Sequence, residues 1–138
     1  MLFRSIVDAS VALKWVVKED GSQEARNLLT ETLAAPELLY VECANALWAM
    51  ARRKQFSAAE AAAAFAAIEG TPIRSISTRA HANMAQIIAF DLDQPVYDCL
   101  YLAAALAERA MFVTADAAFL RAASAKATYR GTVRPLTP

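Results

Sequence analysis

The sequence predicts an α/β protein, an α/β/α sandwich in which helices cover both faces of a short, mainly parallel central sheet. Two observations carry this prediction. Short apolar segments with β-branched residues have the pattern of buried strands, and longer segments whose apolar residues follow helical spacing lie between them. This alternation is typical of parallel sheets, in which helices connect successive strands. The length of 138 residues fits a single domain, residues 1–138, with one core.

The first half of the chain is predicted to hold one strand and four helices. The segment FRSIV is short, apolar and β-branched, as a buried strand would be, and Ser10 can cap the helix that follows it. Ser57 and Glu60 form a capping box before an alanine-rich surface helix, which Gly70 ends. The predicted elements are a strand at 3–7 and helices at about 11–17, 22–33, 37–54 and 58–69.

The second half is predicted to hold three strands and three helices. Thr78 and Asp116 stand where N-caps are favoured, and Pro95 has a first-turn position in its helix. Gly131 precedes a short last strand. The predicted elements are strands at 73–76, 110–114 and around residue 133, and helices at about 78–90, 95–109 and 116–126.

Charge and composition narrow the class of protein. Lys and Arg balance Asp and Glu at 14 each, so the formal charge is zero and gives no overall attraction to nucleic acid or membranes. The sequence has neither a bilayer-length apolar run nor a secretory signal, so we expect a cytoplasmic protein. Cys43 and Cys99 form no CxxC pattern and are expected to be buried free thiols.

Two short basic segments could follow an RNA backbone, or they could be ordinary solvated surface. One is the triplet at 52–54. The other comprises the four basic residues after Asp116, a part of the chain that contains no acid. These residues are Arg121, Lys126, Arg130 and Arg134.

Four carboxylates stand alone in apolar or weakly polar segments: Asp8, Glu42, Asp98 and Asp116. An ionised carboxylate in such surroundings is costly unless it is paired or coordinated to a metal. Each acid has a simpler explanation as a helix cap, a turn former or a surface residue. Together they favour one shared explanation, which is convergence on a divalent cation.

The predicted elements allow this convergence. Asp8 follows the first predicted strand and Asp116 the third, and functional groups of parallel sheets collect beyond the carboxyl ends of strands. Glu42 and Asn45 are three residues apart on one helix, so they share a face. Asp98 lies in the first turn of its helix, where the helix dipole also favours a carboxylate.

The donor types indicate which metal is expected. His81 is the sole histidine, and no pair of thiolates has ligand spacing. Oxygen donors alone favour Mg²⁺ or Mn²⁺ over Zn²⁺. We interpret His81 as a packing or surface residue, Asp91 and Asp93 as loop and capping residues outside the site, and both tryptophans, Trp15 and Trp48, as core or dimer-interface residues.

Four segments resemble, in order, the acidic motifs of PIN-domain ribonucleases: IVDASVALKW, PELLYVECANALW, VYDCLYLAAALA and FVTADAAFL. The size and the DASVALKW opening are most similar to the VapC-type toxins of bacterial type II toxin–antitoxin pairs. The resemblance implies a Mg²⁺- or Mn²⁺-dependent endoribonuclease, usually dimeric, that a cognate antitoxin silences by occupying the active-site groove. One departure is small: the family often has a serine shortly before the Tyr97–Asp98 pair, where this chain has QPV.

Carried over residue by residue, the resemblance assigns the acidic quartet to Asp8, Glu42, Asp98 and Asp116. It assigns supporting positions to Ser10, Asn45 and Thr114. Asp8 and Asp98 are our first-choice direct ligands, and Glu42 and Asp116 are expected to act through water or a second ion.

Two other interpretations stay open at this point. The chain could be a catalytically silent PIN-like module that binds protein or RNA, although such a module has no physical reason to keep four mutually repelling acids. It could also be a phosphoryl-accepting receiver domain. That fold needs a lysine near the end of a late strand, and no lysine comes directly after Val113.

Overall fold

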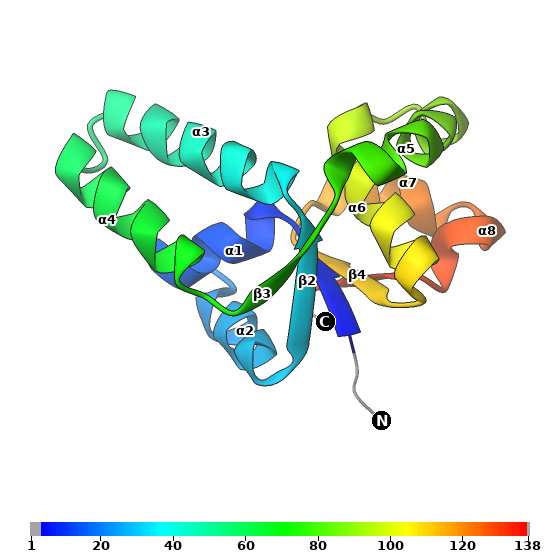
Figure 1. Ribbon diagram of the computed structural model, residues 1–138, viewed down its shortest axis with the longest axis horizontal. Coiled ribbons are helices and arrows are strands. Elements are labelled where there is room, and N and C mark those ends of the chain that lie inside the picture. Colours follow the sequence, from blue (N-terminus) through cyan, green and yellow to red (C-terminus); the bar gives the residue numbers. More distant parts are fainter. Residues whose placement is uncertain (1–3, 138) are drawn as a thin grey trace.

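A computed structural model describes residues 4–137 and places five parallel strands in one central sheet. The order across the sheet is β3-β2-β1-β4-β5, so β2, β1 and β4 each pair with a strand on both sides (Figure 1). The predicted α/β class with a mainly parallel sheet is confirmed. The strands are β1 (Arg4–Val7), β2 (Thr32–Pro36), β3 (Ile73–Ile76), β4 (Met111–Thr114) and β5 (Val133–Pro135).

Helices connect the strands and cover the sheet. Figure 1 shows α3 and α4 as a pair extending from one side of the sheet, with α5 to α8 on the other. No helix within residues 4–137 combines the length and the apolar character needed to cross a bilayer. The helices are α1 (Ala9–Val16), α2 (Ser22–Asn27), the 3₁₀ turn η1 (Leu28–Thr30), α3 (Leu38–Arg52), α4 (Ala58–Glu69), α5 (Thr78–Leu92), α6 (Val96–Glu108), α7 (Ala117–Ser124) and α8 (Ala127–Arg130).

Neighbouring residues of the central strands bury their side chains on opposite faces. Ile6 and Phe112 belong to the larger core cluster, which includes the buried residues of α6. Val7 and Val113 belong to a smaller cluster with residues of α1 and α2. Because side chains alternate along a strand, β1 and β4 can hold both layers together.

Strand β2 is the main feature that the sequence analysis missed. One helix was predicted to continue to about Leu33 and the next to begin at residue 37, because the segment TLAAP is alanine-rich and has a single β-branched residue, Thr32. Its conformation is decided by parallel pairing on both edges, with Leu33 opposite Ser5 of β1 and Ile73 of β3. Tertiary pairing outweighs the weak local preference here.

Several helix ends differ by a residue or two from the predictions. The N-cap of α1 is Asp8 rather than Ser10, and the N-cap of α5 is Ser77 rather than Thr78. The stretch predicted as one helix at 116–126 ends at Ser124, and α8 follows as a separate turn. Helix α5 continues to Leu92, two residues beyond its predicted end. The residue at which the first strand was predicted to begin, Phe3, lies outside the described residues.

Other local predictions are confirmed. Ser57 and Glu60 form both bonds of the capping box, with distances of 3.0 and 2.9 Å. Asp116 caps α7 by accepting the backbone N–H of Phe119. Cys43 and Cys99 are buried free cysteines. Burial raises the pKa of each thiol to about 12, which keeps both neutral near pH 7.

Candidate active site

The four carboxylates come from the ends of two adjacent strands and from two helices. Asp8 follows β1 directly and Asp116 follows β4 by two residues. These strands pair in parallel, so their carboxyl ends lie at the same edge of the sheet. Glu42 lies in the second turn of α3, and Asp98 lies in the first turn of α6.

Both oxygens of Asp8 are held by hydrogen bonds. The Ser10 hydroxyl donates to Oδ1 at 2.5 Å, and the backbone N–H of Val11 donates to the same oxygen at 3.3 Å. The Thr114 hydroxyl donates to Oδ2 at 2.5 Å. Donors on both oxygens fix the orientation of the carboxylate and stabilise its charged form.

The same two hydroxyls connect Asp8 to the segment that carries Asp116. Thr114 is fully buried, and its Oγ1 accepts the backbone N–H of Asp116 at 3.0 Å. The Oγ of Ser10 accepts the backbone N–H of Ala115, also at 3.0 Å. Ser10 and Thr114 therefore tie the loop after β4 to the start of α1. The third predicted supporting residue, Asn45, lies on the exposed surface of α3, one turn after Glu42.

Glu42 has a partner that the sequence analysis did not identify. The hydroxyl of Tyr101 donates to Oε1 of Glu42, which joins α6 to α3 across 59 positions of the chain. Tyr101 was overlooked because a tyrosine in an apolar helix usually belongs to the core. Its spacing of three residues from Asp98 was the available signal, because that spacing puts both side chains on one helix face.

The acids affect one another electrostatically. Burial raises the pKa of Asp8 to about 6, and the charge of Asp98 adds to this shift while the hydrogen bonds oppose it. Burial also raises the pKa of Glu42, with further contributions from the charges of Asp98 and Asp8. The pKa of Asp98 is raised by burial and by the charge of Asp116. Each of the four acids is thus coupled to at least one of the others.

The donors fit a hard divalent cation by their chemistry. All four side chains offer carboxylate oxygens, the ligand type that Mg²⁺ and Mn²⁺ prefer. Within residues 4–137, no three His, Cys, Asp or Glu side chains are already arranged as a metal site. Mg²⁺ commonly keeps several waters and takes only one or two protein carboxylates, so Asp8 and Asp98 satisfy its requirement in number and type.

Asp91 and Asp93, which were predicted to lie outside the site, have structural roles of their own. Asp91 accepts the hydroxyl of Tyr129 at 2.7 Å and lies 3.7 Å from the ammonium of Lys126. Asp93 is the C-cap of α5 with a left-handed backbone, φ 53°. His81 lies in the first turn of α5. None of these three residues shifts the pKa of a quartet member.

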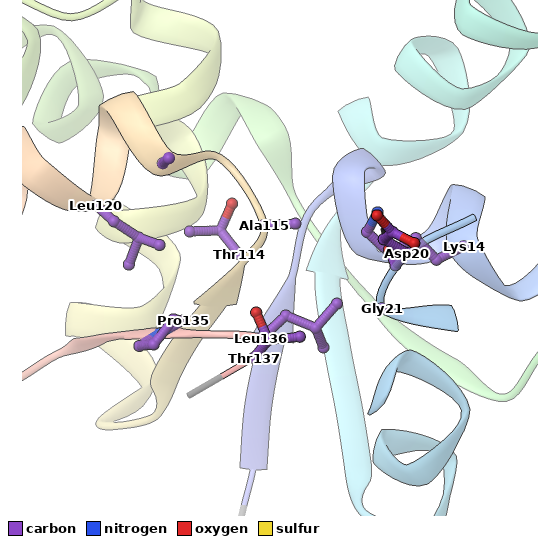
Figure 2. Close-up of a pocket in the computed structure, with 10 residues that line it drawn as sticks. Lys14, Asp20, Gly21, Thr114, Ala115, Leu120, Pro135, Leu136 and Thr137 are labelled. Carbon is purple, nitrogen blue, oxygen red and sulfur yellow. Dashed lines mark hydrogen bonds between the residues drawn. The ribbon is translucent and has the colours of Figure 1, made fainter. Parts of the chain in front are cut away.

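A cavity of about 370 Å³ is lined in part by Thr114, whose hydroxyl donates to Asp8, although the four carboxylates are not among its lining residues. Figure 2 shows Thr114 and Leu120 on one side of this cavity and Lys14 on the other, with Leu136 between them. Its walls are mostly apolar. The ammonium of Lys14 donates to Glu19 at 3.1 Å and to a backbone carbonyl at 2.8 Å. The remaining lining residues are Asp20, Gly21, Ala115, Ala117, Pro135 and Thr137.

Three of the four C-terminal basic residues have partners within the chain. Lys126 pairs with Asp91, Arg134 lies 3.5 Å from Glu31, and Arg130 donates to a backbone carbonyl. These contacts favour the interpretation of this segment as structured surface over a track for RNA.

The two tryptophans differ in their exposure to solvent. Trp15 packs against both core clusters and donates its indole N–H to the carbonyl of Ala25 at 2.8 Å. Trp48 is 55% exposed, and the guanidinium of Arg52 lies 5.1 Å from its ring centroid. Trp15 is thus a core residue, whereas Trp48 is available for contacts with another molecule.

Comparison with known proteins gives one family and several similar folds. The family model described as PIN domain matches residues 5–125. No curated protein gives a significant match. Among solved structures, PAE2754 from Pyrobaculum aerophilum is 20% identical with a TM-score of 0.72, and the match covers 97% of this chain and 84% of that one.

Two other similar structures are described as assemblies. A toxin–antitoxin complex from Klebsiella pneumoniae matches at 13% identity and a TM-score of 0.59, covering 81% of this chain and 86% of that one. VapBC2 from Rickettsia felis, bound to a DNA fragment from its promoter, matches at 13% identity and a TM-score of 0.64, covering 96% and 98%. At these identities the likeness concerns the fold.

Proposed function

This chain belongs to the PIN domain family, and from that premise we propose that it is a metal-dependent endoribonuclease, the toxin of a toxin–antitoxin pair. The observation that carries this proposal is the electrostatic coupling of four carboxylates around the carboxyl ends of β1 and β4. Like charges placed together destabilise a metal-free protein, and a divalent cation relieves their repulsion.

The residues have distinct roles in this proposal. Asp8 and Asp98 would hold Mg²⁺ or Mn²⁺, and Glu42 and Asp116 would act through bound water or a second ion. When bound, the metal activates water and stabilises the attacking and leaving oxygens of a phosphodiester. Hydroxyls from Ser10 and Thr114 keep Asp8 oriented. The amide of Asn45 is exposed to solvent, so it can donate a hydrogen bond to a phosphate oxygen.

The cavity beside Thr114 supports RNA as a substrate because it would accept a nucleotide next to the bond that is cut. Its volume of about 370 Å³ lies in the range of small-ligand pockets. The ion pair of Lys14 with Glu19 offsets the charge on this wall, so the cavity suits an uncharged base or ribose better than a phosphate.

We infer that an antitoxin segment binds the apolar groove between α3 and α4. Two of the similar folds are toxin–antitoxin assemblies by their descriptions, which supports a partner of this kind. The groove has a volume of about 240 Å³, and its alanines would let a helix approach closely, with Trp48 and Phe65 as larger contacts. The other lining residues are Ala44, Leu47, Ala51, Ala58, Ala61 and Ala62.

We infer that a second copy of the chain binds a different surface, formed by α5 and the start of α6. Exposed apolar side chains gather there, which is unusual for a surface that faces only water. Phe90 is 84% exposed, and Ile87 precedes it by three residues on the same helix face. The other members of this α5/α6 surface are Met84, Val96 and Tyr97.

The nuclease proposal is tested with purified protein freed of any partner. Structured RNA is incubated with the wild type, with Asp8→Asn and with Asp93→Asn, in Mg²⁺, in Mn²⁺ and in chelator. We expect metal-dependent cleavage by the wild type and by Asp93→Asn, and none by Asp8→Asn. Equal cleavage by all three proteins would indicate a contaminating nuclease. Intact RNA in every sample, across several substrates and both metals, would instead favour a silent PIN-like binding module.

A further inference from the structure

Tyr101 and Glu42 form a side-chain hydrogen bond between α6 and α3. Helix α3 packs chiefly against α4 and α1, whereas α6 packs against α5 and the central strands. The hydroxyl of Tyr101 donates to Oε1 of Glu42 across this division. No other donor to the Glu42 carboxylate is found among residues 4–137, so its orientation depends on this tyrosine.

Tyr101 is itself held rigidly. Its side chain is 1% exposed, and its ring stacks on Phe112 of β4 with centroids 5.7 Å apart and planes at 15°. Phe112 in turn packs edge-on against Phe119 of α7, with centroids 5.6 Å apart. The hydroxyl is thus presented from the core of the fold, near the two strands whose ends carry Asp8 and Asp116.

A free glutamate on a helix samples many rotamers, and fixing it in one of them costs side-chain entropy. A rigid donor reduces that loss before any ligand arrives, because the side chain is already restricted. The charges of Asp98 and Asp8 both act on the Glu42 carboxylate. Glu42 is therefore electrostatically connected to two other members of the acidic cluster, by which we mean Asp8, Glu42, Asp98 and Asp116.

We propose that Tyr101 is a positioning residue that holds Glu42 toward the acidic cluster, so that the cluster binds its divalent cation with Glu42 in place. This inference rests on the proposed nuclease function. Tyr101 does not reach the substrate, because it is buried. Its contribution passes through Glu42 alone.

The test compares Tyr101→Phe with Tyr129→Phe. Both changes remove one hydroxyl that donates to a carboxylate, but the Tyr129 bond goes to Asp91, outside the cluster. Mn²⁺ affinity is measured by calorimetry, and kcat and KM are measured with RNA. For Tyr101→Phe we expect Mn²⁺ affinity or kcat to fall by about 10- to 100-fold, the usual effect of removing a partner that orients a ligand, with KM unchanged. Tyr129→Phe should match the wild type in all three measurements.

Thermal melting identifies any variant that does not fold, and a double-mutant cycle with Glu42→Gln gives a second measurement. If Tyr101 acts through Glu42, the Tyr101→Phe change should have little further effect on Mn²⁺ affinity or kcat in the Glu42→Gln background. A folded Tyr101→Phe protein with wild-type affinity and kcat would overturn this inference alone. Absence of Mn²⁺ binding and cleavage by the wild type would overturn the proposed function and this inference with it.

Discussion

The hydroxyl of Thr114 lies 2.5 Å from Oδ2 of Asp8 and joins the ends of two neighbouring parallel strands. Oγ1 of Thr114 also accepts the backbone N–H of Asp116 at 3.0 Å. One buried threonine therefore fixes the orientation of one acid and the backbone of a second. A hydroxyl can do both because it donates one hydrogen and accepts through its lone pairs.

We expect Thr114→Val to destabilise the protein and to lower its activity. Valine has nearly the same shape, so the fold is kept, but the half-buried Asp8 carboxylate loses a donor, at a cost of about 1 kcal/mol. Urea unfolding in chelator measures this loss, and the RNA assay measures activity. Thr30→Val is the matched control, because the Thr30 hydroxyl donates to a carbonyl on the exposed surface. A Thr114→Val protein as stable and as active as the control would contradict the role given to this hydroxyl.

The stability of the metal-free protein should decrease as pH rises from about 4 to 7, and Asp8 should account for part of the decrease. The pKa of Asp8 is about 6 in the fold, above its ordinary value near 3.8. Between these values the folded state binds more protons than the unfolded state, so the free energy of unfolding falls as pH rises. In Asp8→Asn this contribution is absent. The variant should gain roughly 2 to 3 kcal/mol relative to the wild type between pH 4 and 7.

Urea unfolding at several pH values, in chelator, measures this difference. Glu42 and Asp98 also have raised pKa values and are present in both proteins. Because the charge of Asp8 contributes to the raised pKa of Glu42, the difference between the two curves reports Asp8 together with its effect on Glu42. Parallel curves would show that Asp8 titrates normally. Mn²⁺ should reverse the order of stability near pH 7, because only the wild type keeps both proposed ligands.

The features predicted well from the sequence are those fixed by neighbouring residues. The capping box of Ser57 and Glu60 needs only a spacing of three residues, and the cap at Asp116 needs only its place before a helix. The closeness of the segments that carry Asp8 and Asp116 needed one inference beyond neighbouring residues, a parallel sheet, because the carboxyl ends of parallel strands share one edge.

The features that were missed depend on distant parts of the chain. Strand β2 is extended because Leu33 and its neighbours pair with strands on both sides, and nothing in TLAAP encodes those partners. The Tyr101–Glu42 bond joins two helices whose relative placement is set by the packed sheet between them. Neither could be found before the arrangement of the strands was known.

Asp98→Asn should weaken Mn²⁺ binding and reduce cleavage by at least about 100-fold, because it removes a proposed direct ligand while keeping the shape of the side chain. Asp93→Asn is the control: Asp93 is exposed with φ 53°, a conformation that asparagine also tolerates. Calorimetry with Mn²⁺ and the RNA assay test both variants. Equal Mn²⁺ affinity for the two would remove Asp98 from the set of ligands.

Phe90→Glu and Trp48→Glu should separate the two proposed interfaces. Phe90 is 84% exposed on the α5/α6 surface, and a charge there should convert a dimer to monomers because its burial against a second copy is costly. Trp48 is 55% exposed and lines the α3–α4 groove. Because it is not part of the α5/α6 surface, Trp48→Glu should leave the dimer intact. Sedimentation velocity of the chain without any partner protein measures the first effect.

Co-purification with the proposed antitoxin measures the second effect. Trp48→Glu should lose antitoxin, since the tryptophan is the largest side chain that lines the groove, whereas Phe90→Glu should retain it. Both variants change an exposed side chain outside the acidic cluster, so each should still cleave RNA when freed of partners. If Phe90→Glu loses antitoxin and Trp48→Glu becomes monomeric, the two surfaces have been assigned to the wrong partners. If neither variant changes assembly, both surfaces are free of partners and the interfaces lie elsewhere on the chain.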